Sequence, residues 1–300
     1  MTSESVEKRR VGFLGLGAMG APMARRLLER GVPLRVFDPN PAATRPFTER
    51  GIEAAATPRA LGAWANVLVC MLPHPDVLRE VILGEEGAIH SLAAGSVVVD
   101  MSTNGPAVVK ACGARLAEKG VGMVDAPVGK GPWAAEKGDL TILMGGDRET
   151  CRSVEPILKM MGSTVYYCGP LGSGQVIKLA NNLVSCANIA VVAEAYALAR
   201  QAGADLGVLA EVMPQTSADS WQLRNTFVKK VLNHDFSPMF KLKLAHKDMR
   251  LILQMAEDLG AAAGCARGAL DWYARADAAG HGELDWGAVL LVADPTLEKA

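Results

Sequence analysis

The chain has 300 residues, half of them hydrophobic, with a formal net charge of −1. This length suffices for two domains, and the balanced charge gives no reason to expect a nucleic acid or a membrane surface as a partner. The six cysteines are scattered without metal-ligand spacing, and the polar N-terminal stretch lacks the apolar core of a secretory signal. The longest apolar stretch, roughly 183–193, is too short to span a bilayer. We therefore expect a soluble, cytoplasmic protein without a metal.

Short apolar runs alternate with helical segments in the first half of the chain. The expected strands are Arg10–Leu14, Leu34–Phe37, Val67–Leu72, Ser96–Asp100, Val121–Asp125 and Thr141–Met144. A helix is expected at Ala21–Glu29, where Gly31 follows as a stop signal. This alternation predicts βαβ units and an α/β domain with a doubly wound, mainly parallel sheet.

The pattern changes near Gly169, and no convincing strand follows. The expected helices are Val176–Gln201, Leu206–Met213, Phe240–Leu259 and Gly264–Ala278, and the residues after about Ala293 are expected to form a loose tail. We therefore predict a first, α/β domain over residues 10–169, and the motifs described next indicate that it binds a nucleotide. An all-α domain over residues 170–295 follows it, built on the long helix.

A glycine-rich turn follows the first expected strand and opens the first expected helix. Gly15 allows a tight turn, Gly17 lets the backbone approach a pyrophosphate, and Gly20 lets the helix pack closely on the strand. Ala18 and Met19 complete the turn. Free N–H groups at the helix N-terminus would then face the phosphates.

The ends of the next strands carry further cofactor candidates. Asp38 ends the second strand, where a carboxylate accepts hydrogen bonds from the adenosine ribose and repels a 2′-phosphate, so NAD is favoured over NADP. Arg35 and Arg45 lie nearby and leave a phosphate possible. Leu72 would lie along the adenosine or its ribose, and residues 100–103 would reach the nicotinamide side.

A polar stripe crosses the long apolar helix. Lys178, Asn182 and Ser185 stand at positions i, i+4 and i+7, which places them on one helical face. Such groups are costly to bury unless a polar partner meets them, and a substrate could be that partner. Lys178 is the candidate general acid, because its place near the helix N-terminus and burial in a cleft both favour the neutral amine. A buried amide serving the backbone remains an alternative for Asn182.

Five segments carry a resemblance to a known family. They are Gly12–Met23, Asp100–Thr103, Asp125–Val128, Gly172–Asn182 and Ala245–Asp248. In this order they resemble the β-hydroxyacid dehydrogenases, the 3-hydroxyisobutyrate dehydrogenase family. The resemblance implies a Rossmann-type N-terminal domain, an all-helical C-terminal domain and a cleft between them. It also implies that Lys178 is catalytic with Asn182 beside it, and that Leu72, Thr103 and Lys247 contact the cofactor.

One departure from the family pattern bears on the substrate. Most of the family reads Ser-Gly-Gly after Asp-Ala-Pro-Val, whereas this chain reads Gly129-Lys130-Gly131. The change resembles the sulfolactaldehyde reductase subgroup, which has Gly-Arg at the first two positions and uses the arginine on the sulfonate. Lysine lacks the planar fork of arginine but could still hold a terminal anion. Asn181, Asn182 and Ser185 match that subgroup and are further candidates for substrate binding. Asp285 and Trp286 match it as well. Ser102 is a substrate candidate from its position at the end of the fourth expected strand.

These observations predict an NAD-dependent oxidoreductase that interconverts a short anionic aldehyde and its hydroxy acid. The favoured pair is 3-sulfolactaldehyde and 2,3-dihydroxypropane-1-sulfonate. Succinic semialdehyde with 4-hydroxybutyrate, or a 3-hydroxyisobutyrate-type substrate, is the alternative. A non-catalytic nucleotide-binding module is an alternative from another class, and Lys178 and Asn182 argue against it. The long apolar helices of the second domain favour a homodimer or homotetramer.

Overall fold

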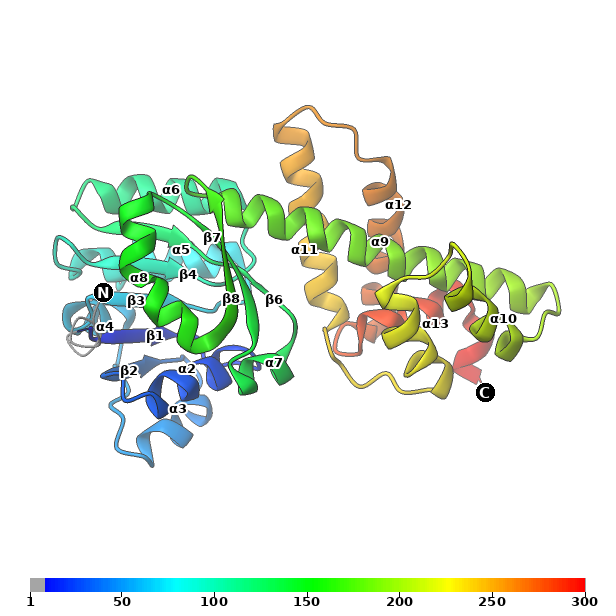
Figure 1. The fold of residues 1–300 in the computed structure, drawn as a ribbon, viewed down its shortest axis with the longest axis horizontal. Coiled ribbons are helices and arrows are strands. Elements are labelled where there is room, and N and C mark those ends of the chain that lie inside the picture. Colours follow the sequence, from blue (N-terminus) through cyan, green and yellow to red (C-terminus); the bar gives the residue numbers. More distant parts are fainter. Residues whose placement is uncertain (1–8, 300) are drawn as a thin grey trace. The chain divides into compact units, whose positions relative to one another are not determined.

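The computed structural model describes residues 9–299 of the chain. The chain divides into two compact units, the first ending at Lys178 and the second beginning at Leu179. This division falls inside the long helix, somewhat later than the predicted boundary at residue 169. We describe each unit by itself (Figure 1).

The first unit is built on one eight-stranded sheet, ordered β2-β1-β3-β4-β5-β7-β6, with β8 beside β7. The strands are β1 Val11–Leu14, β2 Leu34–Phe37, β3 Val67–Cys70, β4 Val97–Asp100, β5 Gly122–Asp125, β6 Val128–Gly129, β7 Leu140–Gly145 and β8 Gly162–Gly169. Strands β1 to β5 run parallel, and β7 pairs antiparallel with β5 and β6. The predicted α/β fold with a mainly parallel, doubly wound sheet is confirmed, and β6 and β8 were not predicted.

Helices cover both faces of this sheet (Figure 1). They are α2 Gly20–Glu29, α3 Pro41–Thr48, α4 Pro58–Trp64, α5 Pro75–Leu83, α6 Pro106–Ala117, α7 Pro132–Lys137 and α8 Arg148–Met161. Proline begins five of them, since its fixed φ suits the first helical turn and its missing N–H is not needed there.

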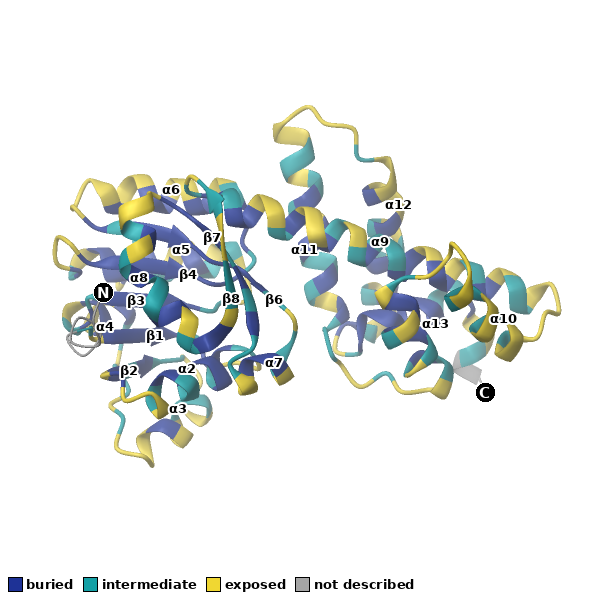
Figure 2. Cartoon of the chain, viewed as in Figure 1, coloured by how far each residue is buried: buried dark blue, intermediate teal, exposed yellow. Residues whose placement is uncertain are grey.

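Successive residues of each buried strand face opposite layers of the unit. Val67 and Val69 of β3 pack in the cluster that includes α2 and α8, whereas Leu68 and Cys70 pack in the cluster with α4, α5 and α6. Both clusters are buried, as Figure 2 shows for the central strands. The parallel strands are therefore packed on both faces, which holds their carboxyl ends in place.

The second unit is helical over its described part, with one isolated β-bridge between Lys241 and Asp285. Its main helices are α9 Ser173–Gln201, which begins in the first unit, α10 Leu206–Val212, α11 Leu242–Asp258, α12 Gly264–Ala276 and α13 Val289–Ala293. One face of α9 carries the core residues Leu179, Cys186, Ile189, Ala193 and Tyr196 at helical spacing. This confirms the all-α second part.

Helix α9 is longer than the apolar stretch noted in the sequence. By length and composition alone it could cross a membrane, and 39% of its most apolar window is buried. The prediction from residues 183–193 that the apolar segment is too short to span a bilayer is therefore wrong for the whole helix. Its buried face lies in the core of the second unit, which is the environment of a core helix.

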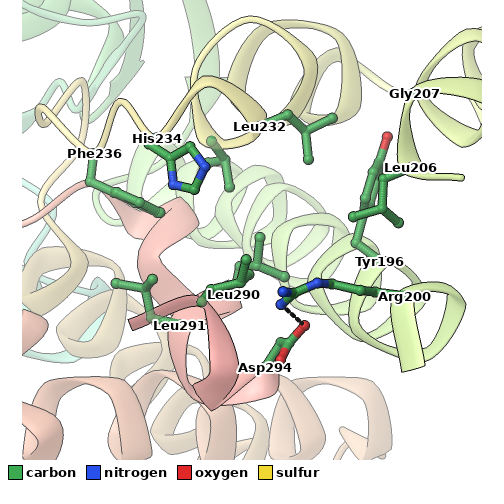
Figure 3. A pocket seen from close by; sticks show the side chains of 12 residues that line it. Tyr196, Arg200, Leu206, Gly207, Leu232, His234, Phe236, Leu290, Leu291 and Asp294 are labelled. Atoms are coloured by element: carbon green, nitrogen blue, oxygen red, sulfur yellow. Dashed lines mark hydrogen bonds and ion pairs between the residues drawn. The ribbon is translucent and has the colours of Figure 1, made fainter. Parts of the chain in front are cut away.

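The expected loose tail is also corrected. Asp294 is buried, and its carboxylate accepts a hydrogen bond from the Arg200 guanidinium at 2.7 Å. Figure 3 shows this ion pair beside Leu290 and Leu291 in a pocket of about 230 Å³. This ion pair, which no local sequence pattern indicates, joins the segment after α13 to α9.

Candidate functional site

The glycine turn between β1 and α2 has the geometry of a nucleotide site. Gly15 has a positive φ of 90°, and a Cβ there would strike the carbonyl oxygen of Met71. A Cβ at Gly20 would strike the carbonyl of Gly15, so both glycines serve the protein's own packing. Gly17 differs, because nothing lies within 4 Å of its would-be Cβ. Gly17 and Ala18 are exposed and Met19 is half-buried, which leaves room for a phosphate at the N-terminus of α2.

Asp38 is fixed against this turn. Its carboxylate accepts hydrogen bonds from the backbone N–H of Leu16 at 2.7 Å and of Asn40 at 2.9 Å. The two arginines considered as phosphate ligands each have an acidic partner: Arg35 pairs with Glu53, and Arg45 pairs with Glu49. The turn and this carboxylate together fit a dinucleotide with a free ribose.

A buried polar cluster lies at the ends of β3 and β4. The Asp100 carboxylate accepts hydrogen bonds from the Ser102 N–H and the Asn104 amide, and the Ser102 hydroxyl accepts one from the Leu72 N–H at 2.8 Å. Burial raises the pKa of Asp100 to about 6, opposed by its hydrogen bonds to Ser102 and Asn104. Ser102 is 1% exposed, so its hydroxyl holds Leu72 in place. This favours a positioning role over the predicted substrate contact. Thr103, next in the loop, is half-buried.

The start of α9 is anchored to the sheet by two side chains that sequence reasoning had not assigned. The buried Asp125 carboxylate, at the end of β5, accepts hydrogen bonds from the N–H groups of Gly172 and Gln175 at 2.6 and 2.8 Å. Burial raises the pKa of Asp125, against these bonds. The Gln175 side chain bonds the loop after β4. No side chain fits at Gly174, whose Cβ would strike the carbonyl of Leu143. The sequence motifs contained both anchors, but their roles require long-range contacts.

The polar stripe continues from this anchored start. Lys178 is half-buried on the second turn of α9 and is the last residue of the first unit. Asn182 is buried one turn later in the second unit, and Ser185 is half-buried. The three residues lie on one helix at the predicted spacing.

A second polar chain lies wholly within the second unit. The Asn181 amide donates to the Asn182 side-chain oxygen at 3.1 Å, and the Asn182 amide donates to Asp248 at 2.7 Å. The other oxygen of Asp248 lies 3.0 Å from the Lys247 ammonium. Asp248 was not predicted as a site residue, although it falls on the buried face of α11 with Ala245. A single acidic residue among the apolar residues of a buried helix face is the sequence signal that could have identified Asp248.

Lys130 stands apart from these clusters. It has a positive φ of 71°, and its ammonium donates to the Asp139 carboxylate at 2.8 Å and to the Asp139 carbonyl at 2.7 Å. The ammonium also lowers the pKa of Asp139. Both side chains are about one third exposed or more. The predicted anion-binding lysine therefore has an internal anionic partner.

Asp285 and Trp286 are structural in the second unit. Asp285 is fully buried and accepts hydrogen bonds from the N–H groups of Met239, Phe240 and Gly287. The Trp286 ring packs edge-on against Phe240 at 5.2 Å. Among residues 9–299, no group of acidic, histidine or cysteine side chains could hold a metal ion.

Comparisons with known proteins agree with this geometry. Residues 10–169 match the NAD binding domain of 6-phosphogluconate dehydrogenase, and residues 172–293 match the family described as NAD-binding of NADP-dependent 3-hydroxyisobutyrate dehydrogenase. The chain is 38% identical to 3-sulfolactaldehyde reductase of Escherichia coli strain K12, over 93% of this chain and 94% of that one. It is 33% identical to 3-hydroxyisobutyrate dehydrogenase of Pseudomonas aeruginosa, over 93% and 96%.

A solved structure shares both parts of the fold. The Mycobacterium tuberculosis 3-hydroxyisobutyrate dehydrogenase with L-serine matches with a TM-score of 0.86 and 30% identity, over 95% of this chain and 98% of that one. The chain therefore belongs to the 3-hydroxyisobutyrate dehydrogenase family. It is an oxidoreductase that uses a nicotinamide cofactor, and it acts on small hydroxy acids or their aldehydes. The alternative of a non-catalytic module is excluded.

Proposed function

We propose that this chain interconverts 3-sulfolactaldehyde and 2,3-dihydroxypropane-1-sulfonate with NAD(H). The observation that carries the proposal is Gly129-Lys130 at the position where most of the family has a serine and a glycine. The similarity to a 3-sulfolactaldehyde reductase over nearly the whole chain supports it. A lysine in this loop would offer a cation to the substrate's terminal anion, where most of the family offers a serine hydroxyl.

The residues of the first unit suit the cofactor. The turn Gly15, Gly17, Ala18, Met19 and Gly20 would hold the pyrophosphate. Leu72 would lie along the adenosine or its ribose, and Thr103 would reach the nicotinamide side. By its match to the family pattern, Lys247 is also proposed as a cofactor contact. The nicotinamide, when bound, supplies the hydride. We propose NAD as the preferred form, because the Asp38 carboxylate would repel a 2′-phosphate.

Lys178 is the proposed catalytic acid. In the reductive direction its ammonium donates a proton to the oxygen of the aldehyde, and in the oxidative direction the neutral amine takes the proton back. Asn182 has its amide orientation fixed by Asn181 and Asp248, which leaves a lone pair of its oxygen for the ammonium one turn earlier. Asn181 and Ser185 would bind hydroxyl oxygens of the substrate.

Lys130 is proposed to exchange one anion for another. Its ammonium pairs with the carboxylate of Asp139, and both side chains are partly exposed. Exposed ion pairs contribute little to stability, so a substrate sulfonate can compete for the ammonium. The loop residue thereby selects for a terminal anion.

The substrate assignment is tested with the purified chain and NADH. Turnover is followed by the loss of NADH absorbance with 3-sulfolactaldehyde, succinic semialdehyde and methylmalonate semialdehyde at matched concentrations. We expect the highest kcat/KM with 3-sulfolactaldehyde. A higher kcat/KM with either carboxylate substrate would assign the chain to the corresponding hydroxy-carboxylate dehydrogenases instead.

We also propose a homodimer or homotetramer assembled through α9. Val184, Val191 and Leu198 are more than half exposed and recur every seven residues, and Ile177 continues the row. A seven-residue apolar repeat is typical of helices that pack along one another. Light scattering after size exclusion should give a multiple of 31.6 kDa, and Val191→Glu should reduce it. A monomeric wild-type chain would contradict the proposed oligomer. Binding of that chain to lipid vesicles would also contradict a cytoplasmic location.

A further inference from the structure

We propose that Gln175 is a positioning residue that joins the loop after β4 to the start of α9. The loop carries Ser102 and Thr103, on the proposed nicotinamide side, and the helix carries Lys178. The proposal rests on the proposed roles of Thr103 and Lys178. All of the groups involved lie in the first unit.

The Gln175 side chain is fully buried, and both ends of its amide are used. Its oxygen accepts hydrogen bonds from the N–H groups of Asn104 and Gly105 at 3.0 and 3.1 Å. Its amide nitrogen donates to the Ser102 carbonyl at 2.9 Å. One side chain therefore satisfies three backbone groups that lie 70 to 73 residues away in the sequence.

The base of this side chain is itself fixed. The backbone N–H of Gln175 donates to Asp125 at 2.8 Å, and so the helix start is tied to the end of β5. Lys178 follows three residues later, about 4.5 Å along the helix axis. A shift of the loop relative to α9 would change the distance between a ligand held by the loop and the Lys178 ammonium.

Loss of the amide should move the loop as well as loosen it. Two buried N–H groups would lose their acceptor, and buried donors are costly to leave unpaired. Asn104 and Gly105 immediately precede Pro106, so they cannot be absorbed into α6 without rearrangement. Misplacement by about 1 Å can lower a rate about 100-fold. The position of the loop should therefore affect the proton-transfer step more than substrate binding.

The first test is Gln175→Met, which keeps the length of the side chain and removes its hydrogen bonds. We expect kcat to fall about 10- to 100-fold, KM for the aldehyde to change less than about 3-fold, and amide exchange at Asn104 and Gly105 to accelerate. The matched control is Gln222→Met, which removes a buried glutamine bonded to Thr226 in the second unit. The control should lower thermal stability while kcat stays within twofold.

The second variant, Gln175→Glu, adds a readout that a merely structural role would not move. An ionised carboxylate accepts from both N–H groups but faces the Ser102 carbonyl without a donor, whereas the protonated form has one donor and one acceptor, like the amide. The kcat of this variant relative to wild type should rise as the pH falls from 8 to 6. Gln175→Glu also tests the proposal if Gln175→Met does not fold.

A wild-type kcat in a folded Gln175→Met, or a pH-independent ratio for Gln175→Glu, would overturn the proposal. A wild-type chain that oxidises NADH with none of the aldehydes would defeat the proposed function alone. In that case the exchange rates at Asn104 and Gly105 still decide whether Gln175 holds the loop. Unchanged exchange in Gln175→Met would then reject this inference separately.

Discussion

Two kinds of acidic side chain occur in the first unit, and their surroundings are opposite. Asp100 and Asp125 are fully buried. Asp100 accepts hydrogen bonds from the Ser102 N–H and the Asn104 side-chain amide, and Asp125 accepts them from the N–H groups of Gly172 and Gln175. Asp139 is partly exposed and bonded to the Lys130 ammonium. Burial raises the pKa of Asp100 and of Asp125, whereas the ammonium lowers the pKa of Asp139.

The buried acids Asp100 and Asp125 therefore have a structural role, whereas the exposed Asp139 makes a contact that a ligand could replace. A buried carboxylate with several hydrogen bonds cannot leave them without a large cost, so it fixes the backbone around it. An exposed ion pair is weak, and either partner can meet another ion at little cost. We therefore expect the buried acids to set the geometry around Lys178 and the exposed pair to affect which substrate is bound.

The largest expected effect comes from removing the group that the buried framework positions. Lys178→Ala should lower kcat about 1000-fold, because general acid catalysis contributes 100- to 10,000-fold. The Kd for NADH, measured by fluorescence, and the melting temperature should change little. Lys137→Ala, a surface lysine of the same unit, is the control and should leave kcat unchanged. Turnover by Lys178→Ala within tenfold of wild type would remove the assigned role.

The next largest effect is the pH dependence of the free energy of unfolding that the buried Asp100 causes. The pKa of Asp100 is raised from 3.8 to about 6, so the folded chain binds this proton more tightly than the unfolded chain does. The ionised form therefore opposes folding: the cost is absent below about pH 4, grows up to about pH 6 and is complete above it. A shift of about two pKa units corresponds to about 3 kcal/mol.

Asp100→Asn removes this titration and leaves a neutral side chain of similar shape. Relative to wild type, the free energy of unfolding of the variant should increase by about 2 kcal/mol between pH 4.5 and 7, because part of the cost is already present at pH 4.5. Urea unfolding at these two pH values measures the change, and the overall stability of the variant does not matter for the comparison. Parallel pH dependences of wild type and variant would show that Asp100 does not titrate in this range.

The cofactor turn and the central strands could be predicted from the sequence because their signals are local. Three glycines at fixed spacing, a preceding apolar run and Asp38 after the next strand all lie within 30 residues. Strand β8 escaped prediction because it is an edge strand in which Tyr166 and Tyr167 are exposed, so it lacks a buried apolar run. Local pattern therefore predicts the centre of a sheet better than its edge.

The anchors of α9 could not be predicted in the same way. The hydrogen bonds of Gln175 and of Asp125 join residues 47 to 73 positions apart, and no periodicity links them. The Lys178, Asn182 and Ser185 spacing was predictable because all three stand on one helix. The partner of Lys130 was missed for a different reason, since a loop lysine has no fixed direction until the fold supplies one.

The smallest expected effects test the exchangeable pair. Lys130→Ala should raise KM for anionic aldehydes about tenfold and leave KM for a neutral aldehyde such as glycolaldehyde nearly unchanged. Asp139→Asn should act in the opposite direction, lowering KM for the anionic substrates about two- to threefold, because the ammonium then has no competing carboxylate. Initial rates of NADH oxidation give both values.

The opposite signs make this pair of variants informative. If Lys130 merely stabilised its loop through Asp139, both variants would weaken the same contact and shift KM in the same direction. Higher ionic strength gives an independent check, because screening should raise KM for the anionic aldehyde in wild type more than in Lys130→Ala. Equal salt dependence in the two proteins would place the anion-binding group elsewhere, and the choice of a sulfonate would lose its support.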